Sequence, residues 1–255
     1  MLSTDSTRTD YQIACTFECD PIVQGPQEIV DMLRMYPSEL ESPFLLSRSS
    51  FGESAEANGI SEATATILDD MKFITASLLS LEGTQYADQA RTKFLATVQW
   101  IHNRLTTGEP DPSLATDMVY QTCRATAAIY TTAILSRKPL SVACTGELLS
   151  KVWMTMWRVP LARWKQMPGV FFFVLLVVNP FTCARPEGRF IKGLFAASTI
   201  AIGFVDWDVV AAILKAFLGV QKWLGGSDEV KAFYEDRLAV SRSPVGGVPA
   251  WSFNK

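Results

Sequence analysis

The sequence predicts an all-α protein, a single irregular domain of about eight to ten helices. Apolar residues recur in steps of three and four along several segments, which places them on one face of a helix. No segment alternates apolar and polar residues between turn signals, so we expect no β-sheet. With 255 residues, 48% of them hydrophobic, the chain can bury one large core.

The predicted helical domain spans residues 27–240, after a polar N-terminal segment, residues 1–26, that we expect to be flexible. Apolar residues at helical spacing predict a first short helix over residues 27–35. Residues 37–59 are rich in serine, with two prolines and two glycines, and are expected to form a long loop. Residues 241–255, rich in serine, proline and glycine, are expected to form a tail.

Three longer helices are predicted next. In residues 60–81 successive apolar positions are three or four residues apart, and Ser61 is a suitable N-cap. Residues 86–105 repeat this pattern up to a loop that contains glycine and proline. A helix over residues 112–136 follows, with Asp111 as N-cap and a proline at the first helical position.

The C-terminal half predicts five more helices, over residues 145–160, 168–179, 186–202, 206–225 and 227–240. Thr145 is a suitable N-cap for the first of them. Asn179 and Pro180 are expected to end the second. In the third, four residues share one face of the helix: Phe190, Leu194, Ala197 and Ala201.

The longest strongly apolar run, from Gly169 to Val178, is ten residues long. A membrane-spanning helix needs about 20 predominantly apolar residues. We therefore expect a helix buried on all sides in the core, and no membrane association. Five scattered cysteines favour a reducing compartment, and the N-terminus lacks the pattern of a secretory signal. We expect an intracellular protein, nuclear or cytoplasmic.

Charge is distributed unevenly along the chain, although the whole chain carries only −3. Residues 1–70 hold three bases and thirteen acids, a net charge of −10. Residues 71–255 hold 20 bases and 13 acids, a net charge of +7. A solvated acidic flank is the expectation, and attraction to a partner or to the basic part of the chain is the alternative.

Few residues are suited to catalysis or metal binding. His102 is the single histidine, and no Gly-x-Ser-x-Gly sequence supplies a nucleophile beside it. Cys15 and Cys19 lack the second cysteine pair that a structural zinc site needs. No glycine-rich phosphate-binding sequence is present either. We expect no cofactor and no metal, and the sequence leaves open whether the chain is an enzyme.

Asp69 and Asp70 form an acidic pair in a predicted helix, similar to the metal-binding motif of helical terpene cyclases. Phe73 occupies the position where that motif has a further acid, and no matching second motif follows. A solvated helix face is therefore the simpler interpretation.

Aromatic and basic residues are concentrated around Trp153, Trp157 and Arg158, with Trp164 nearby. Such a mixture can stack on bases or bind an anionic ligand. The simpler expectation is that the tryptophans pack inside while the bases extend outward. If the chain binds a small molecule, the candidate ligand-binding residues are Trp153, Trp157 and Arg158, together with three polar residues near aromatic ones: Asp69, Asp70 and Tyr130.

Four segments in order carry a family resemblance: Tyr36–Leu40, Cys123–Tyr130, Pro168–Val170 and Arg185–Phe190. Together they resemble the fungal-specific transcription factor domain, the all-helical regulatory half of zinc-cluster fungal transcription factors. The resemblance covers residues from Tyr36 to Trp223. It implies an all-α regulator of transcription whose contact with DNA is made by an N-terminal zinc cluster.

The six-cysteine cluster of that family is absent from these 255 residues, so we do not expect direct DNA binding. One hypothesis is a stand-alone or truncated regulatory module that acts through a protein partner or self-association. The other is a cofactor-free enzyme or small-molecule-binding protein of fungal secondary metabolism, performing cyclisation or pericyclic chemistry on a hydrophobic molecule. The second hypothesis requires a closed apolar pocket between the helices.

Overall fold

The computed structural model describes residues 4–22, 36–81, 87–108, 112–182, 185–186 and 188–225. In these ranges the chain forms one arrangement of helices without strands, which confirms the predicted all-α class. The α-helices are α1 (Thr4–Phe17), α2 (Phe51–Asn58), α3 (Glu62–Ser80), α4 (Ala87–Thr107), α5 (Met118–Ser136), α6 (Leu140–Ala143), α7 (Gly146–Arg158), α8 (Leu161–Trp164), α9 (Pro168–Thr182), α10 (Gly188–Val205) and α11 (Trp207–Gly225). Two short 3-10 helices are η1 (Ser38–Leu40) and η2 (Pro112–Leu114).

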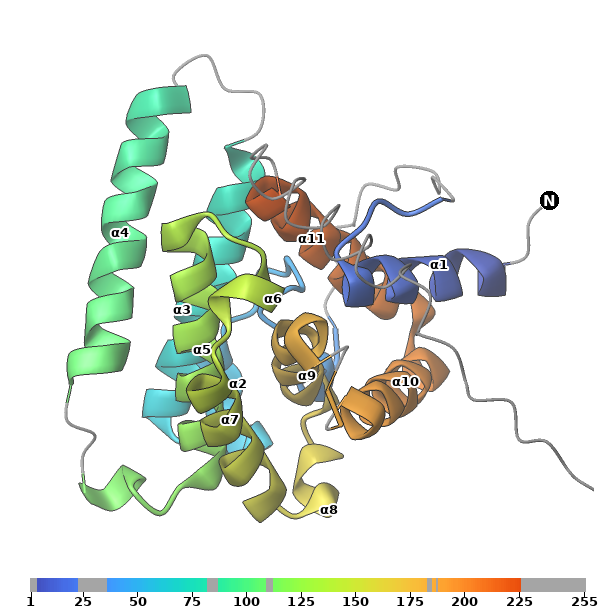
Figure 1. Ribbon diagram of the computed structural model, residues 1–255. Coiled ribbons are helices and arrows are strands. Elements are labelled where there is room, and N and C mark those ends of the chain that lie inside the picture. The colour runs from blue at the N-terminus through green and yellow to red at the C-terminus, as the bar shows by residue number, and fades with distance from the viewer. Residues whose placement is uncertain are drawn as a thin grey trace, which may run out of the picture.

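Helix α9 is the central element, with α5, α6, α10, α1 and η1 packed around it (Figure 1). Every residue from Gly169 to Pro180 is buried, as the apolar run predicted. The helix runs through Pro180 to Thr182, so the predicted end at Asn179 is wrong. At the end of α9 the Thr182 hydroxyl donates a hydrogen bond to the carbonyl of Asn179 at 3.0 Å.

The N-terminal segment differs from the prediction, because residues 4–17 form α1 instead of a flexible lead. Its Tyr11, Ala14 and Cys15 are buried against α9 and α11. Ile13 and Phe17 of the same helix are apolar but exposed, so the apolar residues do not define a single face and the helical pattern is weak.

The predicted loop over residues 37–59 also contains a helix, α2. Ser50 and Glu53 form a reciprocal capping box at its start, and Gly59 ends it with φ +57°. The chain needs glycine there because the left-handed conformation disfavours a Cβ. Serine and glycine are common in loops as well as at helix ends, so the capping residues Ser50 and Gly59 led to the prediction of a loop.

Two predicted N-caps agree with the structure. Ser61 caps α3 and Thr145 caps α7 through their side-chain oxygens, as predicted. Helix α5 begins at Met118 with Asp117 as its N-cap, six residues later than predicted. The predicted N-cap Asp111 lies outside the described residues, as do the predicted elements over residues 27–35, 227–240 and 241–255.

Helix α10 packs mainly against α9 and α11, and Phe190 near its start also contacts Trp153 of α7. Its buried side carries Ile191, Phe195, Ser198, Thr199 and Ile202. The face shared by Phe190, Ala197 and Ala201 is the side that faces solvent. The helix continues past Gly203, its predicted end, to Val205. By length and composition alone α10 would suffice to cross a membrane, and 39% of its residues are buried; one such helix is weak support for a span.

Candidate functional site

The six residues singled out in the sequence fall into two groups. Asp69, Asp70 and Tyr130 lie on α3 and α5, where they hold the helices together. Trp153, Trp157 and Arg158 lie on α7, where part of the group reaches the surface.

Asp69 caps a neighbouring helix. Its carboxylate oxygens accept the backbone N–H groups of Phe51 at 2.8 Å and Gly52 at 3.0 Å, at the start of α2. A carboxylate at a helix N-terminus stabilises the helix dipole and satisfies orphan donors. Asp69 therefore has a structural partner for each oxygen atom.

Asp70 forms an ion pair with Arg104, which links α3 to α4. Within the described ranges, no group of three His, Cys, Asp or Glu side chains is arranged to hold a metal ion. The acidic pair thus has two separate contacts, one with α2 and one with α4.

Tyr130 is fully buried in an aromatic cluster. Its ring lies 5.6 Å from that of Phe44 and 6.2 Å from that of Phe173, and its hydroxyl is 2.9 Å from the hydroxyl of Thr75. Burial raises the pKa of Tyr130 well above its ordinary value, because the charged form loses its hydration. The neighbouring rings fill the space that a ligand would need.

A buried ion pair lies nearby that sequence reasoning missed. Lys72 of α3 and Glu41 approach to 3.4 Å, and both side chains are buried. The Lys72 ammonium also donates to Ser47 Oγ at 2.7 Å and to the carbonyl of Ser49 at 2.6 Å. A serine beside a lysine can form a nucleophile–base pair. Here the lysine is held as a hydrogen-bond donor by a carboxylate and a carbonyl.

His102 links α4 to α5. Its Nδ1 lies 2.9 Å from the hydroxyl of Thr131, which itself donates to the carbonyl of Ala127 at 2.8 Å. Partial burial lowers the pKa of His102 from its ordinary value near 6.5.

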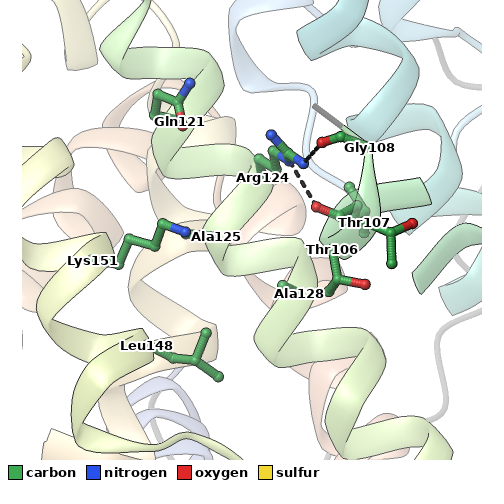
Figure 2. Close-up of a pocket in the computed structure, with 10 residues that line it drawn as sticks. Thr106, Thr107, Gly108, Gln121, Arg124, Ala125, Ala128, Leu148 and Lys151 are labelled. Carbon is green, nitrogen blue, oxygen red and sulfur yellow. Dashed lines mark hydrogen bonds between the residues drawn. The ribbon is translucent and has the colours of Figure 1, made fainter. Parts of the chain in front are cut away.

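A cavity of about 420 Å³ lies where the end of α4 meets α5 and α7 (Figure 2). None of the six candidate residues lines it. Arg124 projects from α5 and caps α4 by donating to the carbonyls of Leu105, at 2.7 Å, and Gly108. The remaining lining residues are Thr106, Thr107, Gln121, Ala125, Ala128, Leu148 and Lys151. This mixed polar lining differs from the closed apolar pocket that a hydrophobic substrate requires.

Aromatic residues gather on the outside of α7. The rings of Trp153 and Trp157 lie 5.3 Å apart, and Trp153 lies 6.3 Å from Phe190 of α10. Leu149, Val152 and Met156 face the core, so the tryptophans, four residues apart, share the outward edge. We call the group formed by Trp153, Met154, Trp157, Leu161 and Phe190 the α7 aromatic surface.

This surface is open to solvent and basic. Trp157 is 51% exposed and Met154 57%. Arg158 is exposed beside them, and residues 145–182 carry four bases and one acid. The expectation that the tryptophans pack inside is confirmed for Trp164, whose Nε1 donates to a backbone carbonyl at 3.2 Å, and wrong for Trp157.

No family model, curated protein or solved structure matches the chain. The resemblance to the fungal-specific transcription factor domain remains a prediction from the residues that carry it.

Proposed function

We propose that this chain is a helical regulatory module, of the kind that the fungal transcription factor domain represents, and that it acts by binding another protein. The observation that carries the proposal is the α7 aromatic surface. Large exposed aromatic side chains cluster on few soluble surfaces, and tryptophan with arginine is the typical composition of an interface hot spot. The module would work in the nucleus or cytoplasm without contacting DNA itself.

The chemistry of the surface indicates its partner. Trp157, Met154 and Leu161 offer apolar contact, while Arg158 and Lys165 are exposed alongside. A protein segment that combines apolar and acidic side chains matches both features. Positive charge next to the aromatic rings would steer such a segment and fix its orientation.

The alternative is a cofactor-free enzyme or a protein that binds a hydrophobic molecule. It would need Asp69, Asp70 and Tyr130 to face a shared apolar cavity. Their contacts with backbone, arginine and packed rings support the interaction module instead.

The test is a reporter assay in which the full chain is tethered to a heterologous DNA-binding domain. We expect the chain to change transcription several-fold, and the double variant Trp157→Ala, Arg158→Glu to lose most of that effect. Trp100→Ala with Arg104 retained is the matched control, because Trp100 is 61% exposed on α4 with an arginine over its ring. A reporter unchanged by the tethered wild-type chain would count against the proposal.

A further inference from the structure

The solvent side of α10 is apolar along its length. Phe190, Ile200, Phe204 and Val205 are 61%, 50%, 84% and 61% exposed. Between them the small residues Gly193, Ala196, Ala197 and Ala201 are exposed as well. No charged residue occurs from Gly193 to Val205. We call the side formed by Phe190, Gly193, Ala197, Ile200, Ala201 and Phe204 the outer face of α10.

Such a face differs from an ordinary surface helix. Helix α4 is also exposed on one side, but there the exposed Trp100 is accompanied by polar residues: Asp88, Gln89, Thr92, Lys93 and Gln99. A helix that is apolar all round is normally covered on all sides. Among the residues that the structure describes, the core covers the inner side of α10 and leaves its outer face exposed, which suits a second macromolecule.

We propose that the outer face of α10 pairs with the same face of a second copy of this chain, antiparallel about a two-fold axis beside Ala197. Ala197 is the midpoint between Phe190 and Phe204, and also between Gly193 and Ala201. In this arrangement Ala197 opposes itself, small residues meet small residues, and each Phe190 lies near the partner's Phe204. Small residues at the centre allow the two backbones to approach closely.

Charge complementarity favours the antiparallel second copy. Arg185 and Arg189 are exposed at the start of α10, where Glu187 is the one acid between them in the sequence. Asp206, which accepts the N–H groups of Asp208 and Val209 at the start of α11, and Asp208 follow the end of α10. Antiparallel pairing brings the basic start of each helix to the level of the acidic end of the other, twice per dimer. Parallel pairing would place like charges together, and the acidic end would be repelled by an anionic lipid surface.

The available area suits a dimer. Since a buried aromatic side chain covers about 150–250 Å², Phe190 and Phe204, 61% and 84% exposed, offer roughly 200–350 Å² per copy, and Ile200 and the small residues add to this apolar area. A standard interface uses about 800 Å² per partner, including a polar rim. The charged ends of the helix supply such a rim. This inference goes beyond the proposed function; the two surfaces share Phe190, and the variants below are at Ala197, outside the α7 aromatic surface.

Sedimentation velocity of the full chain tests the pairing. We expect a particle of twice 28.2 kDa at micromolar concentration for the wild-type chain. Ala197→Glu places two carboxylates at the axis and should give a folded monomer. Ala96→Glu, at an exposed alanine in the middle of α4, is the matched control and should remain a dimer.

A second variant tests the pairing independently, in case the first variant does not fold. Ala197→Cys should form a disulfide-linked dimer under mild oxidation, because the residue opposes its own copy at the axis. Ala96→Cys and the wild-type chain should not. This result supports the antiparallel geometry even if Ala197→Glu fails to fold.

Three outcomes would overturn the inference: a wild-type monomer, a dimer that survives Ala197→Glu, or a monomer that floats with vesicles of anionic phospholipid. The last would assign the outer face to a membrane. A monomeric Ala197→Glu variant that keeps the Trp157-dependent reporter effect would separate this interface from the proposed function.

Discussion

The indole ring of Trp153 lies 6.3 Å from the phenyl ring of Phe190, with the ring planes at 65°. This edge-to-face contact joins α7 to α10 and connects the α7 aromatic surface with the outer face of α10. Apolar side chains therefore continue across two helices on the outside of the molecule. The polar groups that sequence analysis associated with chemistry are instead engaged between helices.

Truncating Trp157 is expected to affect binding more than folding. The side chain is half exposed, so Trp157→Ala should change the free energy of unfolding by less than about 1 kcal/mol. A hot-spot tryptophan commonly contributes about 2 kcal/mol or more to an interface. Chemical denaturation and photo-crosslinking from position 157 measure the two effects. Equal crosslinking from position 100 of α4 would argue against a specific surface.

Removing the Asp69 carboxylate should loosen α2 selectively. Asp69→Ala leaves the N–H groups of Phe51 and Gly52 without their acceptors, and we expect a loss of about 1 kcal/mol in stability. Hydrogen exchange should rise in Phe51–Asn58 before it rises in α9. If α2 keeps its protection, the capping role assigned to Asp69 is wrong.

Breaking the buried ion pair should be costly. Lys72→Met leaves Glu41 buried without its cation, which typically costs about 3–5 kcal/mol. Adding Glu41→Gln should recover at least half of that loss, because the uncompensated charge is gone. Equilibrium unfolding of both variants tests the pair.

A variant of Ser47 distinguishes a structural role from a catalytic role of the contact between Ser47 and Lys72. Ser47→Ala should leave the reporter effect intact. Loss of function with unchanged stability would instead support a catalytic serine and lysine.

His102 should make stability depend on pH. Its pKa is lowered in the folded state, so the unfolded chain takes up a proton first as the pH falls below about 6.5. Stability is therefore retained above that pH and declines as the pH falls through the lowered folded-state pKa. Denaturation of the wild-type chain and His102→Gln between pH 8 and 5 should show a weaker decline in the variant. Identical slopes would contradict this role.

The sequence predicts a feature of the fold well where the signal lies within a few neighbouring residues. Ser61 and Thr145 cap the helices that they were expected to cap, and the run in α9 is buried as expected. The caps depend on neighbouring residues only, and a continuous apolar run is itself a local signal of burial. The predicted start of α5 is too early. Asp111-Pro112 matches an N-cap followed by proline, but the N-cap of α5 in the structure is Asp117.

Tertiary partners explain the rest. Asp69 caps a helix that begins 18 residues earlier, and Glu41 meets Lys72 across 31 residues, so neither contact has a local signal. Helix α10 is apolar on both sides, and periodicity alone did not determine which side faces the core. Trp153 and Trp157 of the α7 aromatic surface formed a visible cluster in the sequence, whereas the contribution of Phe190 and the exposure of Trp157 depend on how α7 and α10 pack.

Native mass spectrometry of the full chain, purified under non-denaturing conditions from the cells that produce it, tests the central claim most directly. We expect a mass that corresponds to protein assemblies, with twice 28.2 kDa for the chain alone and a larger species with a partner. The larger species should disappear with Trp157→Ala and persist with Trp100→Ala. A monomer that retains a small molecule of defined mass would contradict the account and favour an enzyme or ligand-binding protein.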